Sequence, residues 1–274
     1  LPVELLNPKP GDMVLDLCAA PGGKTTQIGA KMANKGFLVA NDVNYKRLLS
    51  LKRNIQLFGL SNTIVTNEQP LSLKRQFSGF FDKILIDAPC SGEGMFRRDD
   101  RTKNKYEGYE PNKFTDLQKM ILNDASDLLK PGGTMVYSTC TFSLEENEEI
   151  IEWFLTQNHH FKTIPAHNLE KIRNHVSFGF NGFGDAIRIW PHIHKGEGHF
   201  AVRLEKEISG HVNAMTCDAD MDSSISKASE SAVLDFFKEI GLQTDNLIGN
   251  LHLEREKVIL YSSVAVTNLN CIYK

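Results

Sequence analysis

The sequence predicts an α/β protein built on an open, mostly parallel sheet. Short apolar runs alternate with segments of helical periodicity over residues 1–205, which is the pattern of βαβ units with right-handed crossovers. Two of these runs, Ile84–Ile86 and Thr134–Tyr137, end abruptly in small, turn-prone segments that carry Cys90 and Cys140. Chemistry in open α/β sheets lies just beyond the carboxyl ends of the strands. If the two strands are neighbours, about 4.8 Å apart, both thiols reach one site.

The first half of the chain supplies four strands and their connecting helices. β-Branched apolar runs bounded by Gly, Pro, Asn or Asp indicate buried strands, and apolar residues at helical spacing that stop at Gly59 indicate a helix. The expected strands are Met13–Leu17, Phe37–Ala40, Thr63–Thr66 and the run ending at Asp87; the expected helices are the end of one within residues 1–9, then 25–35 and 45–58.

The second half completes a sheet of seven strands. A helix over 115–129 ends at Lys130-Pro-Gly-Gly133, a stop-and-turn signal that precedes the fifth strand. Ser143 and Glu146 match a capping box that opens a helix to about residue 157. Two alternating strands, 186–190 and 200–204, finish the sheet.

The chain changes character after residue 205. Residues 209–231 are polar and poor in large apolar side chains, which indicates a linker, and a short helix over 232–240 and a strand over 258–261 follow. We therefore expect one domain over 1–205, and a linker with a partial C-terminal module over 206–274. The chain starts at Leu1 and its first strand comes early, so we expect a fragment or trimmed chain.

Composition excludes several classes of protein. The net charge of −3 provides no global basic field, so nucleic-acid binding would depend on local patches. Five cysteines without a C-x-x-C pair argue against a disulfide framework or a structural zinc site. No apolar run approaches the length of a membrane span. We expect a cytoplasmic monomer without membrane attachment, and we interpret the histidines as loop or core residues rather than metal ligands.

The loop after the first strand is the candidate ligand site. Its glycines allow close approach to the backbone, and the helix that follows offers free N–H groups. A P-loop would need glycine where Cys18 stands, and the dinucleotide pattern Gly-x-Gly-x-x-Gly is absent. Asp42 follows the second strand, where a carboxylate accepts hydrogen bonds from a ribose. A nucleoside ligand without polyphosphate fits, such as S-adenosylmethionine; the alternative is a tight turn with a helix cap.

Three motifs carry a family resemblance. With CAAPGGKT, then DAPCSGEG, then YSTCT followed by EEN, the chain resembles the Sun/RsmF-like family of RNA (cytosine-5) methyltransferases over residues 1 to about 205. The resemblance implies a seven-stranded, mostly parallel Rossmann-like class I methyltransferase sheet with helices on both faces. It also implies S-adenosylmethionine as methyl donor and a cytosine in RNA as acceptor.

The same resemblance assigns roles to individual residues. It implies that Cys140 is the nucleophile, that Cys90 assists release of the product, and that Asp87 lies between cofactor and target base. Asp42 would take the ribose, with Glu68 or Asn67 as a further cofactor contact. The loop that would line the cofactor site consists of Cys18, Ala19, Ala20, Pro21, Gly22, Gly23 and Lys24.

The chemistry explains the need for thiols. Carbon 5 of cytosine is a poor nucleophile until a thiolate adds to carbon 6. A carboxyl group such as Asp87 suits stabilisation of the intermediate at the N3 and amino edge of the ring. DNA cytosine-5 methyltransferases use the Pro-Cys motif after the fourth strand, which would nominate Cys90, whereas the RNA family resembled here nominates Cys140. We expect the helix near Ser143 to lower the pKa of the attacking thiol.

Several alternatives remain at this stage. Both cysteines are of a residue type that is often simply buried. The loop containing Cys90 is loosely like the Asp-Pro-Pro-Tyr loop of amino-group methyltransferases, and a non-catalytic RNA-binding assembly factor would keep the same fold. The basic run Arg97–Lys105 is either a solvated loop or an RNA-backbone contact. Small-subunit (16S) ribosomal RNA is the preferred substrate and transfer RNA the alternative, and we expect RNA affinity to be weak in this chain.

Overall fold

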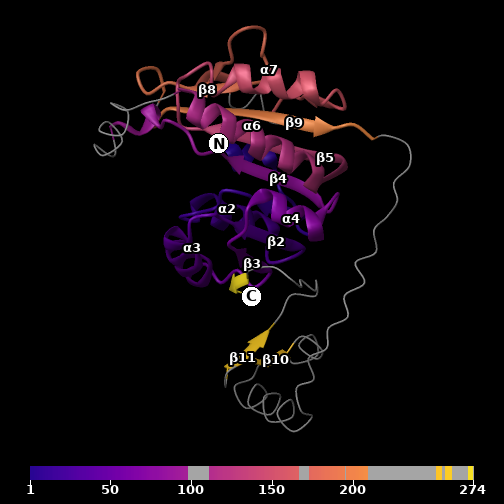
Figure 1. Ribbon diagram of the computed structural model, residues 1–274. Coiled ribbons are helices and arrows are strands. Elements are labelled where there is room, and N and C mark those ends of the chain that lie inside the picture. Colours follow the sequence, from indigo (N-terminus) through magenta and orange to yellow (C-terminus); the bar gives the residue numbers. More distant parts are fainter. Residues whose placement is uncertain are drawn as a thin grey trace.

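A computed structural model describes residues 1–97, 111–166, 173–194 and 196–208, with backbone alone for 111–113, 251–254, 257–260 and 271–273. Over these residues a ten-stranded sheet runs through the molecule with helices on both faces (Figure 1). Its order is β12-β3-β2-β1-β4-β5-β9-β8-β7, and β6 also pairs with β9. The predicted α/β class with a mostly parallel central sheet is confirmed.

The first four predicted strands form the parallel half of the sheet. They are β1 (Met13–Asp16), β2 (Phe37–Asn41), β3 (Thr63–Thr66) and β4 (Phe81–Asp87), and they alternate with α1 (Pro2–Leu6), α2 (Gly23–Met32), α3 (Tyr45–Leu57) and α4 (Pro70–Phe77). Helix α4 was not predicted from the sequence. This helix has only eight residues and leaves Leu71 63% exposed, so its apolar face is too short to give a clear helical period.

The second half adds antiparallel strands. Its elements are η1 (Glu93–Met95), α6 (Pro111–Leu128), β5 (Leu129–Thr139), α7 (Glu148–Gln157), β6 (Phe161–Thr163), η2 (Arg173–His175), β7 (Ser177–Phe178), β8 (Ile187–Ile189) and β9 (His199–Lys206). β5 pairs with β4 in parallel, and β9 lies antiparallel to both β5 and β8. All seven predicted strands are present. The sheet is larger than expected because β6, β7 and β12 extend it.

The turn predicted before the fifth strand lies inside that strand. β5 begins at Leu129, immediately after α6 ends, and includes the Lys130–Gly133 segment. Leu129 pairs with Phe81, but the next pair is Lys83 with Thr134. The register shift shows that the turn residues are accommodated as an irregularity in one strand, with Gly132 at a φ of +78°.

The predicted start of the helix after β5 is also wrong. α7 begins at Glu148, and only half of the expected capping box forms: Ser143 Oγ accepts the Glu146 amide at 3.3 Å. The reciprocal bond is missing because the Glu146 carboxylate is fully buried and accepts the backbone N–H of Ser91, in another loop. A tertiary contact therefore overrides the local cap.

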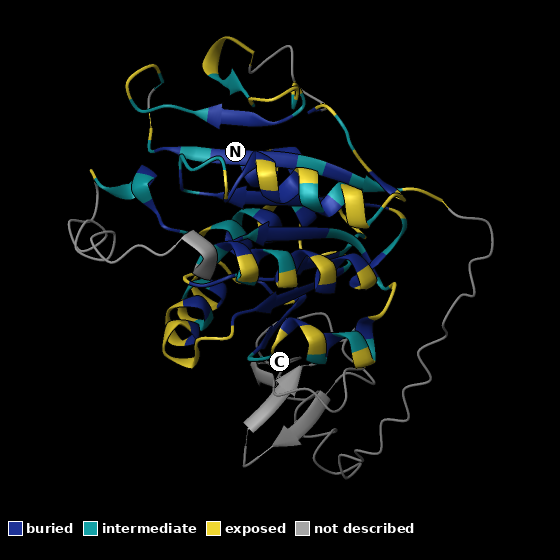
Figure 2. Cartoon of the chain, turned by 45° about the horizontal axis from the view of Figure 1, so that its top comes forward, coloured by how far each residue is buried: buried dark blue, intermediate teal, exposed yellow. Residues whose placement is uncertain are grey.

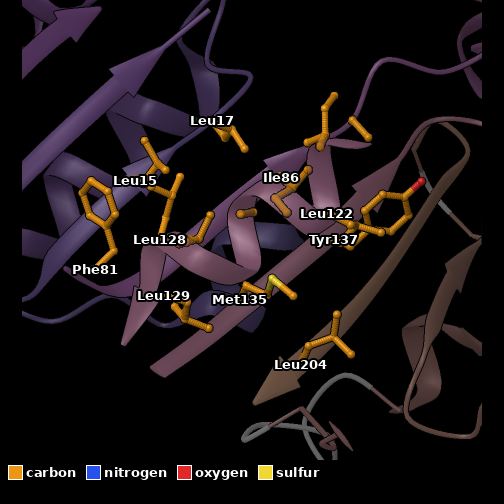
Figure 3. Close-up of a cluster of buried hydrophobic side chains, with 14 of the residues drawn as sticks. Leu15, Leu17, Phe81, Ile86, Leu122, Leu128, Leu129, Met135, Tyr137 and Leu204 are labelled. Atoms are coloured by element: carbon orange, nitrogen blue, oxygen red, sulfur yellow. The ribbon is translucent and has the colours of Figure 1, made fainter. Parts of the chain in front are cut away.

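The two largest apolar cores lie on opposite faces of the sheet, whose strands are mostly buried (Figure 2). Figure 3 shows side chains of the larger core. One packs α4, α6 and α7 against the sheet and contains Ile84, Ile86 and Tyr137; the other packs α1 and α2 against it and contains Leu85 and Val136. Consecutive residues of β4 and β5 thus alternate between the cores, so both strands are buried on both faces. This double burial fixes the position of the loops that follow them.

The C-terminal part contributes three strands. β10 (Leu251–Glu254) and β11 (Lys257–Leu260) form an antiparallel hairpin, and β12 (Cys271–Tyr273) pairs antiparallel with β3. β11 corresponds to the strand expected over 258–261, whereas the expected linker over 209–231 and helix over 232–240 lie outside the described residues. Within the described part of the chain, no helix is long and apolar enough to cross a bilayer.

Candidate active site

The loop after β1 turns back against β2 before α2 begins. Ala19 N donates to Asn41 O at 2.8 Å, and Gly22 caps α2 with a φ of +109°. A Cβ at Gly22 would lie 3.0 Å from Leu51 Cδ1 of α3. Glycine is needed there for both conformation and space. The cap makes no side-chain hydrogen bond, so the first turn of α2 presents its N–H groups toward the loop.

The Asp42 carboxylate accepts hydrogen bonds from both this loop and the start of α3. The carboxylate is buried, and its Oδ2 accepts the Ala20 N–H at 3.1 Å while Oδ1 accepts the Asn44 N–H at 2.9 Å. Arg47 Nη1 lies 3.3 Å from Oδ2, and Arg47 Nη2 donates to Ala20 O. Arg47 was not predicted as a site residue, and its position at the start of α3 is the only sequence signal that points to this role.

The two residues proposed as a further ligand contact lie beside Asp42, beyond β3. Asn67 Nδ2 donates to Asp42 O at 2.7 Å, and Glu68 N donates to Asn41 Oδ1 at 3.0 Å. Both residues are half-buried. The carboxyl ends of β1, β2 and β3 therefore meet at one polar edge.

Cys90 and Cys140 come together as the strand-exit argument predicts. β4 and β5 pair in parallel with Asp87 opposite Ser138. Beyond that pair, Cys90 Sγ lies 3.4 Å from Cys140 Sγ, and Cys140 N donates to Cys90 Sγ at 3.4 Å. Both residues are half-buried and unoxidised.

The thiols have opposite acidities. Their mutual hydrogen bond lowers the pKa of Cys140 and raises the pKa of Cys90, and burial raises the pKa of Cys90 further. Burial also raises the pKa of Cys18 far above that of a free thiol. The thiolate is the reactive form, so Cys140 is the candidate nucleophile of the three described cysteines.

The contribution expected from a helix stays a prediction. α7 begins at Glu148, and its N-cap Asn147 bonds the residues on either side of Cys140: it accepts from Thr139 Oγ1 at 2.6 Å and donates to Thr141 O at 3.1 Å. The hydrogen bond from Cys90 is the largest influence that lowers the pKa of Cys140.

An ion pair connects the β1 loop with the thiol pair. Lys24 Nζ lies 2.6 Å from Asp87 Oδ2, and Ser138 Oγ donates to Asp87 Oδ1 at 2.9 Å. The two charged side chains are 30% and 31% exposed, so a ligand entering from solvent can reach both. Lys24 and Asp87 thus lie where the β1 loop and the β4 exit meet.

Asp16 is a buried carboxyl group behind the same loop. Burial raises its pKa to about 7, even though Thr25 Oγ1 donates to Oδ2 at 2.6 Å. Oδ1 has no hydrogen-bond partner among the described residues. An unpaired acceptor here fits a ligand that carries a positively charged amino group, as S-adenosylmethionine does.

The Cys140 loop is held by the loop that carries Cys90. Glu93 Oε2 accepts the Phe142 N–H at 2.7 Å and also the Thr141 hydroxyl. Gly94 N donates to Cys140 O at 2.8 Å, and a Cβ at Gly94 would lie 2.8 Å from that oxygen. Two consecutive residues of one loop therefore fix three consecutive residues of the other.

Glu146 provides a second link between these loops. Its Oε2 accepts the Ser91 N–H at 3.1 Å and Gln118 Nε2 at 2.8 Å, while Tyr137 Oη donates to its carbonyl at 2.7 Å. The sequence reading treated Glu146 as a cap. Its place in the EEN motif was the signal that could have suggested more.

The remaining sequence candidates fall outside the thiol site. Of the basic run, only Arg97 is described; it is 63% exposed and lies 3.9 Å from Glu197. His199 is half-buried, and desolvation lowers its pKa to about 4, with smaller effects from the charges of Asp87 and Lys24. The part of the chain that the structure describes contains no group of three or more potential metal ligands.

The sheet order and these loops define a class of protein. A ligand loop after β1, an acidic residue after β2, and reactive groups beyond β4 and β5 all lie along one carboxyl edge of a doubly wound sheet. This is the architecture of a Rossmann-like methyltransferase.

Comparisons with known proteins agree. A family profile described as 16S rRNA methyltransferase RsmB/F matches residues 3–205. The Klebsiella pneumoniae ribosomal RNA small subunit methyltransferase F is 38% identical over 220 residues, which cover 75% of this chain and 43% of that protein. The Caenorhabditis elegans 26S rRNA (cytosine-C(5))-methyltransferase nsun-1 is 35% identical over 214 residues, covering 75% and 32%.

A solved structure is also similar. NSun6 from Pyrococcus horikoshii with SFG superposes with a TM-score of 0.65 at 32% identity, covering 75% of this chain and 52% of that chain. The chain spans less than half the length of the two curated relatives above. It belongs to the RsmB/F family of 16S rRNA methyltransferases, which confirms the resemblance of the three motifs.

Proposed function

We propose that this protein transfers a methyl group from S-adenosylmethionine to carbon 5 of a cytosine in ribosomal RNA. The observation that carries the proposal is the 3.4 Å pair of thiols, one with a lowered pKa, beside the Lys24–Asp87 ion pair. The names of the nematode and bacterial relatives support a cytosine and a ribosomal RNA, respectively. Small-subunit RNA is the preferred acceptor, which would place the reaction in the cytoplasm.

Residues at the edge of β1 to β3 would hold the cofactor. The SFG of the archaeal NSun6 structure is an analogue of S-adenosylmethionine, and the uncapped start of α2 with the unpaired Asp16 Oδ1 fits such a molecule. We assign the 18–24 loop, Asp42 and the Asn67–Glu68 segment to this role. When bound, S-adenosylmethionine supplies the methyl group.

The protein's own residues account for activation of the base. The Cys140 thiolate would add to carbon 6 of cytosine, and the electrons of the 5,6 double bond would make carbon 5 nucleophilic. Asp87, held by Lys24 and Ser138, would bind the N3 and amino edge of the ring. After carbon 5 is methylated, loss of its proton regenerates the double bond and expels the Cys140 thiolate.

Cys90 is assigned to the release step. Its pKa is raised and that of Cys140 is lowered, so Cys90 would be the thiol that donates a hydrogen bond to the departing Cys140 sulfur. The same reading gives residues 1–205 the role of catalytic domain, and 206–274 that of linker and partial C-terminal module.

Covalent capture tests this proposal. Incubation with S-adenosylmethionine and an RNA containing 5-fluorocytosine should give a protein–RNA adduct that survives denaturing gels, because carbon 5 then has no proton to lose. Cys140→Ser should abolish the adduct and turnover, and Cys90→Ser should accumulate an adduct even on ordinary cytosine. An adduct that persists in Cys140→Ser would reassign the nucleophile.

The substrate is tested separately. Bisulfite sequencing of ribosomal and transfer RNA from a strain that lacks the full-length protein should show one missing 5-methylcytosine, in small-subunit ribosomal RNA. Loss of a transfer RNA site instead would leave the chemistry intact and change the acceptor.

A further inference from the structure

The carboxyl edge of the sheet continues past the thiol pair to a group of aromatic side chains. β9 is antiparallel to both β5 and β8, so β8 runs parallel to β5 and ends at the same edge. Trp190 follows the last residue of β8 directly, and Phe142 lies two residues past Cys140. We call Phe142, Phe180, Trp190 and His192 the aromatic ledge.

Trp190 lies at the centre of the aromatic ledge, and each of the other three rings contacts it. Phe142 stacks on Trp190 with centroids 5.0 Å apart and an interplanar angle of 18°. Trp190 also lies 6.1 Å from Phe180 and 6.0 Å from His192. Phe180 is 46% exposed, His192 is exposed, and neighbouring Ile193 is 63% exposed. Solvent therefore reaches the Phe180 and His192 side of the aromatic ledge.

A buried cation, Arg188, holds the aromatic ledge in place. Arg188 and Glu148 are each 1% exposed and form an ion pair, with Nε 2.8 Å from Oε1. The Arg188 guanidinium lies 5.0 Å from the Phe180 ring and 5.3 Å from the Trp190 ring, and its Nη1 donates to Phe142 O. Glu148 Oε1 also accepts the Phe180 N–H at 3.0 Å. The ledge is thus ordered before any partner binds.

We propose that the aromatic ledge stacks the bases of single-stranded RNA next to the target cytosine, which makes it the RNA-docking surface of this domain. The inference rests on the proposed function and names the part of the substrate that this surface takes. A cytosine drawn to Cys140 leaves its neighbours without a stacking partner. Aromatic side chains replace that partner irrespective of base identity.

Position and charge favour RNA as the occupant. Along the sheet edge, the cofactor loops lie beyond β1 to β3, the thiols beyond β4 and β5, and the aromatic ledge beyond β8. An RNA that places one base at Cys140 would therefore meet the ledge with the next. Arg97, on the chain segment that follows Cys90, is 63% exposed and lies 3.9 Å from Glu197, and its exposed guanidinium offers a cation for a phosphate.

Tryptophan fluorescence reads this contact directly. Trp153 and Trp190 are the two tryptophans of the sequence, so Trp153→Phe leaves Trp190 as sole reporter. A single-stranded, cytidine-containing RNA of about 12 nucleotides, longer than the shortest sites of single-strand-binding folds, should quench its emission. An abasic RNA of the same length should bind more weakly and quench little, with binding followed independently by the anisotropy of a 5′ dye.

A matched pair of substitutions tests the energetic contribution. Phe180→Ser removes an exposed ring of the aromatic ledge, whereas Phe58→Ser removes a ring that is 62% exposed beyond α3, on the cofactor side of the sheet. Loss of one stacked base should weaken RNA binding about tenfold in Phe180→Ser. Phe58→Ser should bind as the parent does, and both variants should bind S-adenosylhomocysteine equally.

The outcomes separate this proposal from the proposed function. Equal quenching by intact and abasic RNA, equal RNA affinity of the two serine variants, or no RNA binding by the parent chain would each overturn the docking role. RNA stacking on Trp190 without any methyl transfer would support the docking role and count against the proposed enzyme activity. If the protein transfers methyl groups and Phe180→Ser leaves the KM for RNA unchanged, the proposed enzyme activity would be supported and the docking role would be overturned.

Discussion

Cys90 and Cys140 carry the same thiol group but differ in acidity. The hydrogen bond between them raises the pKa of Cys90 and lowers that of Cys140. Cys140 gains an S–H donor that stabilises its thiolate, and Cys90 loses acidity by serving as that donor. Cys18, the first residue of the ligand loop, is half-buried, and desolvation raises its pKa. At the scale of single residues, acidity is set by immediate neighbours rather than by residue type.

Alkylation should reveal this difference. Among the three described cysteines, iodoacetamide at pH 7.5 should modify Cys140 first and Cys18 last, because the thiolate reacts. Cys90→Ala removes the hydrogen bond and should slow the modification of Cys140 at this pH. Peptide mass spectrometry over a time course measures both rates. Faster labelling of Cys90 than of Cys140 would contradict the assignment.

Asp16 should make stability depend on pH. Its folded pKa of about 7 lies above the value of about 4 for a free carboxyl group, so the folded state binds an extra proton between these values. Stability from this group is present below about pH 4 and is lost as pH rises through 7, by about 1.4 kcal/mol per unit. Urea unfolding at several pH values should show that slope.

Asp16→Asn is the matched test for this residue, since it removes the titrating proton. Its unfolding free energy should change less between pH 4 and 7 than that of the parent. Asp127→Asn, at a carboxylate that is 59% exposed, should keep the slope of the parent chain. An unchanged slope in Asp16→Asn would exclude this carboxyl group as the source.

At the scale of elements, the site depends on one loop holding another. The segment from Cys90 to Met95 binds the Cys140 loop through the Glu93 carboxylate and the Gly94 amide, and Glu146 binds back across the gap. Each loop follows a strand that is buried on both faces. The rigid sheet therefore sets the spacing, and the three contacts set the orientation of the attacking sulfur.

Removal of the Glu93 carboxylate should lower the rate of covalent capture more than the affinity for the cofactor. Glu93→Ala leaves the Phe142 N–H and Thr141 hydroxyl without their acceptor. A hydrogen bond to a charged group contributes about 1.5–3 kcal/mol, so the rate of covalent capture should fall about 10- to 100-fold. Affinity for S-adenosylhomocysteine should stay the same, because no described contact of Glu93 reaches the β1 loop.

Two companion variants interpret that result. Glu93→Gln keeps an acceptor oxygen and should restore part of the rate. Glu145→Ala removes a more exposed carboxylate of the same region, which bonds Ser143, and should behave like the parent. A large loss of cofactor affinity in Glu93→Ala would mean that the loop acts on folding instead of orientation.

At the scale of the whole molecule, the sheet order separates the residues proposed to bind the cofactor from those proposed to bind RNA, with the thiols between them. The β3-β2-β1 side carries the candidate cofactor groups, the β4 and β5 exits carry the thiols, and the β9-β8 side carries the aromatic ledge. Lys24 and Asp87 form the ion pair that connects the first two parts. Substitutions on one side should therefore leave binding on the other side intact.

Calorimetry with S-adenosylhomocysteine tests this separation. Asp42→Ala removes the carboxylate that binds Ala20, Asn44 and Arg47, and it should weaken cofactor affinity at least tenfold, or about 1.4 kcal/mol. Cys140→Ser should bind the cofactor as the parent does. Asp124→Ala, at a paired carboxylate of α6, is the control for general destabilisation. Normal binding in Asp42→Ala would remove this residue from the cofactor site.

Local sequence signals were enough to predict the alternation of seven strands with most of their helices, the candidate residues and the family, but not α4 or strands β6, β7 and β12. Apolar runs, turn residues and three motifs are local signals, and local signals are sufficient to predict alternating strands and helices. They also predicted that two strand exits would bring Cys90 and Cys140 together. They misplaced the start of α7, because the burial of Glu146 against the Ser91 loop is a long-range contact with no local pattern.

The surroundings of the two thiols come from tertiary packing. The 3.4 Å contact between Cys90 and Cys140, the bonds that Glu93 accepts and the raised pKa of Asp16 depend on distances between segments that are far apart in the chain. The same is true of the aromatic ledge, whose rings come from three separate segments around buried Arg188. Sequence spacing carries no information on such contacts, because packing across the sheet edge creates them.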